Sequence, residues 1–290
     1  MTVIGYEKLN PLLNATELRK AIENKVKELR DYTPKVGVFG VTGVGKSSLC
    51  NALFGKEAAA VSDVAACTRQ PSEIFIGSDG VGIRLIDVPG VGETIERDKE
   101  YFELYKSLLP ELDLVLWVIK ADDRAYAVAE KAYKEILKPD MKRCPVLFVI
   151  NQVDKLNPLR DWDEAHNVPG VEKQKNIDAK ILEVSKAFDV SANYIEPVSV
   201  AEKYNLAQLV DKIIEVLPNE KKYSVLREAK EELRSSESQE SAEKGVWETV
   251  KNYAGELWDS VKDVTVEVIA ASATKVIKNI WGWLSFKVNI

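Results

Sequence analysis

Residues 36–50 read VGVFGVTGVGKSSLC, and this stretch decides the fold. Its first five residues predict a buried strand, and a helical pattern begins near Lys46. From Gly40 to Ser47 the chain matches the phosphate-loop pattern GxxxxGK followed by Ser or Thr, in its required place between strand and helix. Glycines let successive backbone N–H groups turn inward around phosphates, and the helix N-terminus adds the positive end of its dipole. The sequence therefore predicts a nucleotide phosphate site.

Two side chains of this loop have specific expected roles. Lys46 supplies a point charge to the β- and γ-phosphates, and the hydroxyl of Ser47 is a ligand that Mg²⁺ accepts. The nucleotide contacts expected from the loop are Thr42, Gly43, Val44, Gly45, Lys46, Ser47 and Ser48.

A second motif, Asp87-Val88-Pro89-Gly90, stands at the end of the strand pattern GIRLI. An aspartate there can hold Mg²⁺ through water, and the N–H of Gly90 can sense a γ-phosphate. Alone, this motif is a common strand-end turn, but about forty residues after a phosphate loop it becomes specific. Asp87 and Gly90 are therefore expected nucleotide contacts, with Asp87 also a contact of Mg²⁺.

The third motif, Asn151-Gln152-Val153-Asp154, follows the strand pattern PVLFVI and decides the base. The carboxylate of Asp154 can accept hydrogen bonds from N1–H and from the exocyclic amine of guanine, whereas adenine has no such pair of donors. We expect Asn151 to tie this loop to the phosphate loop, and the stem of Gln152 to cover one face of the base. A weaker fourth element, Ser199-Val200-Ala201, stands where a backbone N–H is needed to read the guanine O6.

The remaining patterns predict a three-layer α/β fold with a mostly parallel, six-stranded sheet. The strand patterns lie at 36–40, 73–76, 82–86, 112–119, 145–150 and 194–200, and helix-like sequence follows the first and the last three of them. The pair 73–76 and 82–86 predicts a hairpin. By contrast, 114–119 and 145–150 are apolar on both faces, as in the covered interior of a parallel sheet.

The chain divides into three expected parts. Residues 1–35 form an N-terminal helical arm with an amphipathic helix at 15–31, and residues 36–217 form the nucleotide-binding domain. Residues 218–290 form a C-terminal helical region. Within it, the charged and serine-rich segment 227–244 has no clear apolar face, so we expect a solvated helix or a linker there.

Composition sets further limits. Of 290 residues, 46% are hydrophobic and 30% charged, which excludes a disordered or fibrous chain. The formal charge of −6 is unusual for a protein that mainly binds nucleic acid. Cys50, Cys67 and Cys144 are too few and too widely spaced for a disulfide framework or a zinc site. With neither a signal-peptide pattern nor a membrane-spanning run, we expect a cytoplasmic protein, either soluble or peripheral at a membrane.

The ordered set GVTGVGKSS, CTRQ, DVPG, NQVD and SVA resembles the five G motifs of the translation-factor-related GTPases. Within these it resembles the Era/TrmE/EngA-type group, and especially the small bacterial Era-like GTPases of the YfjP/YeeP type. The resemblance covers residues 36–217 and implies a Ras-like P-loop GTPase domain that binds GTP or GDP with Mg²⁺. It makes Thr68 the switch I threonine, which closes on Mg²⁺ and the γ-phosphate, and Gly90 the switch II glycine. Ser47 and Asp87 match the other Mg²⁺ contacts.

The chain departs from the patterns of related GTPases at three positions, one of which is Gln152 in place of the usual lysine of the guanine motif. Ras-type enzymes place a water-orienting glutamine after this glycine, but Val91 stands here. Several relatives hold an activating K⁺ with a phosphate-loop asparagine, and the matching residue is Gly43. Catalysis would therefore rest on Lys46, Thr68 and Gly90 with Mg²⁺, and intrinsic turnover is expected to be slow, on the order of 10⁻⁴ to 10⁻² s⁻¹. Further candidates to assist the chemistry are Arg69, Glu93, Asp122 and Asp123, while His166 is expected at the surface.

Several partners are open. A protein effector that binds the C-terminal helices is the first, and a second copy in a nucleotide-dependent dimer is another. RNA or the ribosome is disfavoured by the acidic chain and by a tail without a GxxG nucleotide-clamping loop. A membrane surface is supported by the amphipathic, tryptophan-bearing tail at 246–284, although such helices more often pack against protein. A nucleotide-gated binding module with little or no hydrolysis is the non-enzyme alternative.

Overall fold

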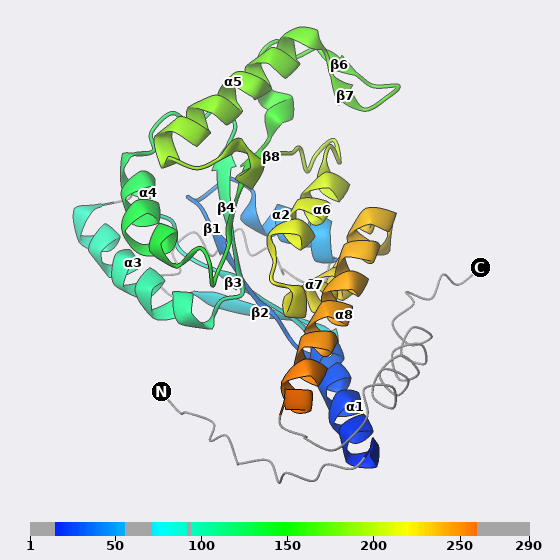
Figure 1. Ribbon diagram of the computed structural model, residues 1–290. Coiled ribbons are helices and arrows are strands. Elements are labelled where there is room, and N and C mark those ends of the chain that lie inside the picture. The colour runs from blue at the N-terminus through cyan, green and yellow to red at the C-terminus, as the bar shows by residue number, and fades with distance from the viewer. Residues whose placement is uncertain (1–14, 56–70, 92–93, 260–290) are drawn as a thin grey trace.

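The computed structural model describes residues 15–55, 71–91 and 94–259 of the chain. At its centre is a six-stranded sheet with the strand order β2-β3-β1-β4-β5-β8 (Figure 1). All neighbouring strands in this sheet are parallel except β2 and β3, so the predicted sheet is confirmed. Its strands are β1 (Lys35–Phe39), β2 (Ser72–Ser78), β3 (Val81–Asp87), β4 (Leu114–Lys120), β5 (Val146–Asn151) and β8 (Ile195–Pro197).

The strand register places three loops at one edge of the sheet. Val38 of β1 lies opposite Asp87 of β3, and Lys120 of β4 lies opposite Asn151 of β5. Because these strands are parallel, the loops that follow β1, β3 and β5 leave the sheet on the same side. β8 is shorter than its sequence pattern and ends at Pro197, which has no N–H to donate to a neighbouring strand.

Helices cover both faces of the sheet (Figure 1). The helices α2 (Lys46–Phe54) and α6 (Leu206–Val216) contribute to the hydrophobic core on one face. The other core is built by α3 (Ile95–Leu108), α4 (Ala127–Ala132), its π-helical continuation Tyr133–Leu137, and α5 (Val171–Phe188). At the centre of that second core, Trp117 contacts the rings of Phe39, Tyr105, Tyr133, Phe148 and Phe188.

Short elements complete the architecture. A two-stranded hairpin, β6 (Trp162–Asp163) and β7 (Val168–Pro169), lies between β5 and α5, and the sequence patterns did not predict it. Single 3₁₀ turns span Leu109–Glu111, Lys138–Asp140, Val153–Lys155, Ala192–Tyr194 and Glu231–Leu233.

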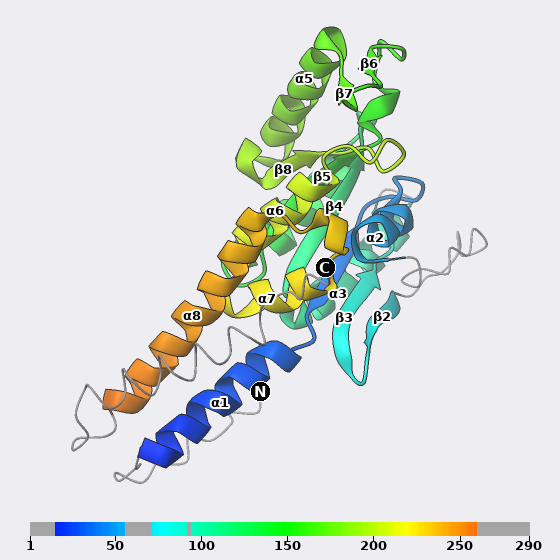
Figure 2. The same ribbon diagram turned by 90° about the vertical axis from the view of Figure 1, so that its right-hand side faces the viewer.

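Three helices from the two ends of the chain pack together beside the sheet. They are α1 (Ala15–Asp31), α7 (Asn219–Glu228) and α8 (Ser236–Asp259), and we call them the helical extension. α1 occupies the residues predicted for it, and both ribbon views show it alongside α8 (Figures 1 and 2). The buried apolar face of the extension is formed by Ile22, Val26, Leu29, Val225, Leu226, Ala242, Val246, Val250 and Ala254.

The charged segment 227–244 differs from the expected solvated helix or linker. Most of it is helical, and Ser238 and Ala242 of α8 are buried. Two arginines within it bind backbone carbonyls: Arg227 donates to those of Arg30, Tyr32 and Gly82, and Arg234 to those of Ala229 and Arg227. Small buried residues and carbonyl-binding arginines leave no apolar periodicity, which explains why the pattern was misleading.

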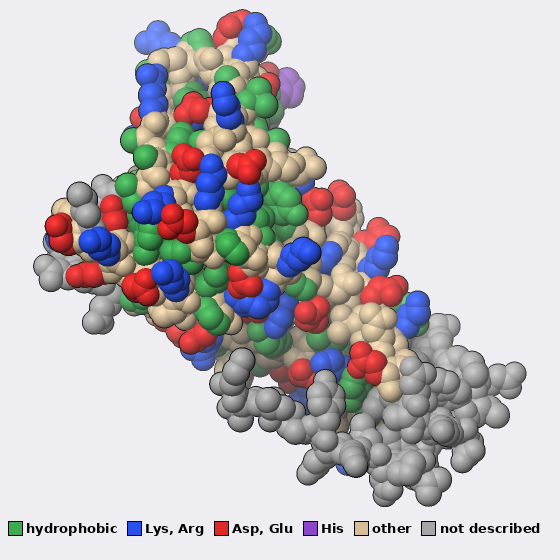
Figure 3. Space-filling view, turned by 60° about the vertical axis from the view of Figure 1, so that its left-hand side comes forward, with side chains coloured by type: hydrophobic (Ala, Val, Ile, Leu, Met, Phe, Trp, Pro, Cys, Tyr) green, Lys and Arg blue, Asp and Glu red, His purple; other side chains and the backbone are tan. Residues whose placement is uncertain are grey.

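The face of the molecule shown in Figure 3 has no large patch of a single charge among its described residues. On the face shown in Figure 3, basic and acidic side chains are interspersed over the described part of the chain. Among the described residues, no helix has the length and apolarity needed to cross a bilayer. The side chains from position 257 onward, including three of the tail tryptophans, lie outside the description.

Candidate functional site

The phosphate loop connects β1 with α2 at the carboxyl edge of the sheet. α2 begins at Lys46, and the φ angles of Gly43 and Gly45 are 84° and 91°, in the left-handed region that favours glycine. Gly45 also has no space for a side chain, because a Cβ there would lie 2.5 Å from Nδ2 of Asn151. We call the loop at residues 151–154 the base loop, and its close approach to the phosphate loop requires glycine at position 45.

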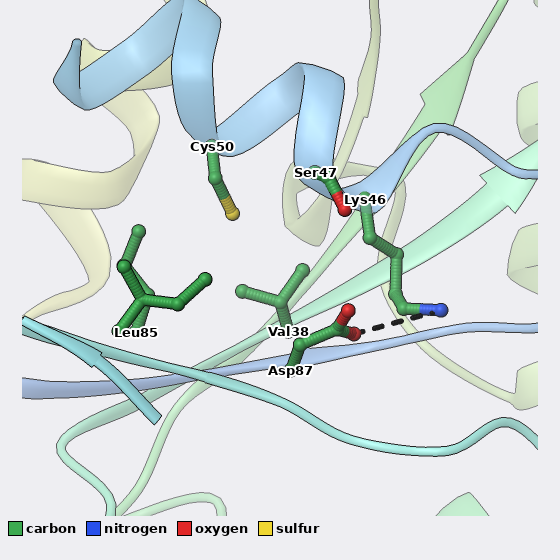
Figure 4. Close-up of a pocket in the computed structure, with 7 residues that line it drawn as sticks. Val38, Lys46, Ser47, Cys50, Leu85 and Asp87 are labelled. Carbon is green, nitrogen blue, oxygen red and sulfur yellow. Dashed lines mark ion pairs between the residues drawn. The ribbon is translucent and has the colours of Figure 1, made fainter. Parts of the chain in front are cut away.

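The side chain of Lys46 lies over its own loop. Its Nζ donates to the carbonyl of Gly40 at 2.9 Å and to that of Val41 at 3.5 Å. The same Nζ is 3.6 Å from Oδ1 of Asp87, an ion pair drawn in Figure 4. The ammonium group therefore brings positive charge to the phosphate loop, as phosphate binding requires.

Asp87 faces the first turn of α2 across a small pocket that Ser47 and Cys50 line from the helix (Figure 4). Burial raises the pKa of Asp87, and the charge of Lys46 opposes this shift. Within the described residues, Oδ1 of Asp87 is buried and has no hydrogen-bond partner. A desolvated carboxylate oxygen beside a serine hydroxyl suits a Mg²⁺ ion, which prefers oxygen ligands. Burial raises the pKa of the Cys50 thiol to about 12, so it remains protonated near neutral pH.

The second motif packs directly against the phosphate loop. A Cβ on Gly90 would lie 2.5 Å from Cα of Val41 and 2.6 Å from the carbonyl oxygen of Gly40, so the two backbones are in contact. The preceding carbonyl, of Pro89, accepts a hydrogen bond from the hydroxyl of Tyr105 at 2.8 Å. This bond anchors the motif to α3 on its other side.

The base loop is tied to the phosphate loop at two points. Nδ2 of Asn151 donates to the carbonyl of Val44 at 2.9 Å, and Nε2 of Gln152 donates to the carbonyl of Gly43 at 3.3 Å. Gln152 adopts a left-handed backbone conformation with φ of 65°, which turns the chain sharply out of β5. The expected link between the two loops is present.

The fourth motif contacts the third. Oδ1 of Asp154 accepts a hydrogen bond from the hydroxyl of Ser199 at 2.6 Å, and that hydroxyl accepts one from the N–H of Glu202 at 3.2 Å. Ser199 is fully buried, whereas Asp154 and Val200 are partly exposed. The weak Ser199-Val200-Ala201 element is thus the direct partner of the residue expected to read the base.

Comparison with known proteins identifies the family. Residues 35–152 match the family described as 50S ribosome-binding GTPase. YfjP of Escherichia coli (strain K12) is 34% identical over 96% of this chain and 98% of its own. The chain belongs to the YfjP family of P-loop GTPases. YkfA of the same organism is 36% identical over 89% of each chain.

Era is a more distant relative of this YfjP-family GTPase. The structure of Era from Aquifex aeolicus bound to GDP and aluminium fluoride is 29% identical, with a TM-score of 0.47. The match covers 64% of this chain and 57% of the Era chain. The P-loop GTPase family that the G-motif resemblance implied is confirmed by the family match over residues 35–152 and by the similarity to YfjP.

The structure leaves some expected residues of this GTPase outside the site or outside the description. Thr68, Arg69 and Glu93 lie outside the described residues. Asp122 pairs with Lys120 at 3.0 Å, and Oδ2 of Asp123 accepts a hydrogen bond from the N–H of Lys120 at 3.3 Å. His166 lies in the turn between β6 and β7 with its side chain 77% exposed, as expected of a surface residue.

Sequence reasoning missed a group behind the base loop of this GTPase. The buried residues of α5 are Lys173, Ile177, Lys180, Val184 and Phe188. Their spacing of three and four residues is that of a buried helical stripe, and two of the five are lysines. Lysines at apolar positions were the signal available in the sequence.

Proposed function

We propose that this chain binds Mg·GTP, hydrolyses it slowly to GDP and phosphate, and acts as a molecular switch. The observation that supports this most directly is the hydrogen bond from Asn151 to the carbonyl of Val44. It sets the distance between a phosphate-binding loop and a loop with a guanine-reading carboxylate. A bound nucleotide would span the two, with its phosphates at the phosphate loop and its base at Asp154.

In this proposal the backbone amides from Thr42 to Ser48 and the ammonium of Lys46 hold the phosphates. The carboxylate of Asp154 accepts hydrogen bonds from N1–H and the amine of guanine, and its bond from Ser199 fixes the carboxylate rotamer. The N–H of the loop at Val200 reads O6, and the stem of Gln152 covers one face of the base.

The residues present fit a Mg²⁺ ion. Ser47 and Asp87 line one pocket, and Oδ1 of Asp87, which is buried and accepts no hydrogen bond from the described residues although Lys46 is paired with it at 3.6 Å, could take a cation directly or through water. Thr68 would complete the set on the γ-phosphate side. When bound, Mg²⁺ supplies charge neutralisation for the phosphate oxygens.

The expected slow hydrolysis has a physical reason in switch II. Val91 follows Gly90 and is only 3% exposed, and its side chain can neither donate nor accept a hydrogen bond. Catalysis then rests on positioning and charge from Lys46, Mg²⁺ and the loop amides, with Thr68 and Gly90 as γ-phosphate contacts. Loops at these two residues would order on the γ-phosphate and relax after hydrolysis.

The partner that we propose is a protein effector that binds the helical extension. The extension joins the domain at the amino-terminal ends of the strands, where Arg227 binds the carbonyl of Gly82 at the start of β3. It therefore presents a surface remote from the nucleotide. Interspersed surface charge in Figure 3 and a net charge of −6 favour a protein over RNA as this partner.

The test is a set of binding and turnover measurements on wild type and Asp154→Asn. Wild type should bind GTP and GDP with Mg²⁺ at least about a hundredfold more tightly than ATP, and single-turnover assays should show slow phosphate release. Asp154→Asn should lose GDP affinity and gain affinity for xanthosine diphosphate, because an amide can donate to the O2 of xanthine. Equal binding of ATP and GTP would refute the base assignment, and tight GTP binding without phosphate release over hours would refute the hydrolase.

A further inference from the structure

Two lysines of α5 point into the protein, where ammonium groups are rare. Lys173 has no exposed surface and Lys180 is 5% exposed. A buried ammonium group is strongly destabilising unless its protons are taken up by acceptors. The groups that accept hydrogen bonds from each ammonium therefore show which segment of the chain that lysine holds in place.

Lys173 holds the base loop. Its Nζ donates to the backbone carbonyl of Asp154 and, at 3.4 Å, to that of Leu159. The ring of Trp162 covers the ammonium group, with 5.6 Å between Nζ and the ring centroid. Burial lowers the pKa of Lys173, and the negative charges of Asp154 and Asp161 oppose that shift.

Other groups of α5 also form hydrogen bonds with the segment between β5 and β6. Oδ2 of Asp161 accepts a hydrogen bond from the N–H of Lys173 at 2.7 Å, which caps the first turn of the helix. Gly170 allows this contact, because a Cβ there would lie 1.8 Å from Oδ1 of Asp161. One turn further along the helix, Nδ2 of Asn176 donates to the carbonyl of Asn157 at 2.8 Å.

The β6–β7 hairpin connects α5 and the base loop to the loop that contains Ser199. Trp162 packs edge-on against Tyr204, with ring centroids 5.4 Å apart. Nδ2 of Asn167 donates to the carbonyl of Glu202 at 2.7 Å. Tyr204 and Glu202 both lie in the loop whose Ser199 binds the carboxylate of Asp154. The contacts of the hairpin therefore connect the group that holds the backbone of Asp154 with the group that holds its side chain.

We propose that Lys173 is a positioning residue for guanine recognition, which fixes Asp154 from behind through its backbone carbonyl. This inference rests on the proposed function, since it assumes that Asp154 reads the base. A carboxylate that must accept two parallel hydrogen bonds tolerates little displacement of its backbone. Loss of the ammonium group would let the loop shift and weaken the bond to the exocyclic amine in particular.

Lys180 provides a matched control on the same helix. Its Nζ donates to the carbonyl of Asp123 and, at 3.1 Å, to Oε1 of Glu183, and it lies 5.0 Å from the ring centroid of Tyr126. It is thus a second buried lysine that binds a backbone carbonyl, but in the loop after β4. Lys173→Met and Lys180→Met make the same chemical change at equal depth.

The experiment measures dissociation constants for GDP and inosine diphosphate, which lacks the 2-amino group, on the full-length protein. We expect Lys173→Met to weaken GDP binding by about tenfold or more and to reduce the preference for GDP over inosine diphosphate. Lys180→Met should keep that preference. In an Asp154→Ala background, Lys173→Met should have no further effect on it.

The outcomes separate the two proposals. If wild type shows no guanine preference, the proposed function fails. If wild type shows it and a folded Lys173→Met keeps it, only the present inference fails. Lys173→Gln, whose amide is one atom too short to reach the loop, is the second variant and should behave like Lys173→Met. Failure of both variants to fold would assign Lys173 to the stability of the fold and overturn the inference.

Discussion

Asn151 and Val44 are joined by a hydrogen bond between positions 107 residues apart in sequence. The donor is the amide of the base loop and the acceptor is a carbonyl of the phosphate loop, and both residues are about 1% exposed. The bond makes the two halves of the nucleotide site one unit. Displacement of either loop therefore has to move the other or break a buried bond.

Asn151→Ala should weaken GDP binding and lower stability together. The carbonyl of Val44 would lose its partner in a buried place, which typically destabilises by about 1–3 kcal/mol. Calorimetric titration and thermal melts should show both losses. Asn252→Ala, at an exposed position of α8, serves as the control and should change neither quantity. A normal GDP affinity in Asn151→Ala would contradict the coupling of the two loops.

Gly90→Ala should disrupt the nucleotide site through contact alone. The added methyl group would meet the backbone of Val41 and Gly40 at 2.5 Å and 2.6 Å, distances that real Cβ atoms do not show. We expect a loss of GTP affinity of at least about tenfold, measured by titration. Gly255→Ala places the same methyl group on α8 with nothing within 4 Å, and should stabilise the protein by about 0.5–1 kcal/mol. Similar behaviour of the two variants would show that the motif does not pack on the phosphate loop as described.

Glu196 should make stability fall as pH rises. Burial raises its pKa from an ordinary 4.5 to about 7, although Lys212 opposes the shift and Nδ2 of Asn205 donates to its Oε1 at 3.3 Å. Between these values the folded protein binds the proton and the unfolded chain does not, so raising the pH through this window destabilises the fold. Glu196→Gln should remove this dependence and be more stable than wild type by about 1–3 kcal/mol at pH 8, with no difference near pH 4.

The measurement for Glu196 is urea unfolding at several pH values. Glu164→Gln, at an exposed position in the β6–β7 turn, is the control and should follow the wild-type curve. Parallel curves for wild type and Glu196→Gln across the whole range would rule out a buried, titrating carboxyl group at this position.

Arg227→Met should loosen the helical extension while it leaves the nucleotide loops in place. The guanidinium group donates to the carbonyls of Arg30, Tyr32 and Gly82, and so joins α7 to α1 and β3. Loss of these bonds should cost about 1–3 kcal/mol and increase hydrogen exchange in α1. Arg19→Met removes an exposed ion pair on α1 and should cost about 0.5 kcal/mol or less. Unchanged exchange in α1 of a folded Arg227→Met would argue against this joint.

Strong periodicity and motif chemistry made much of the molecule predictable. The apolar runs of β4 and β5 and the glycine-rich loop before Lys46 have few alternative structures, and the link from Asn151 to the phosphate loop follows from its place at the end of β5. The Ser199 loop was weaker in sequence, because its main contribution is one side-chain bond to Asp154 that no pattern encodes.

Three features could not be read in this way. Lysines are usually solvated, so the place of Lys173 and Lys180 on the apolar stripe of α5 is a weak signal in sequence, and what each lysine binds is apparent only from its backbone acceptor in the structure. The helical extension depends on contacts between segments far apart in sequence, which local periodicity does not report. The β6–β7 strands have only two residues each, too few for any alternation to be detected.

The packing of α1 against α7 and α8 has a consequence for synthesis on the ribosome. Arg227 binds the carbonyl of Arg30 from 197 residues further along the chain. During translation α1 emerges before α7 and α8, whose apolar residues share its core with Ile22 and Val26. A nascent chain therefore carries an uncovered apolar helix while the whole sheet between α1 and α7 is being made. Chaperone binding to ribosome-held intermediates should map to α1 and end when α8 leaves the exit tunnel.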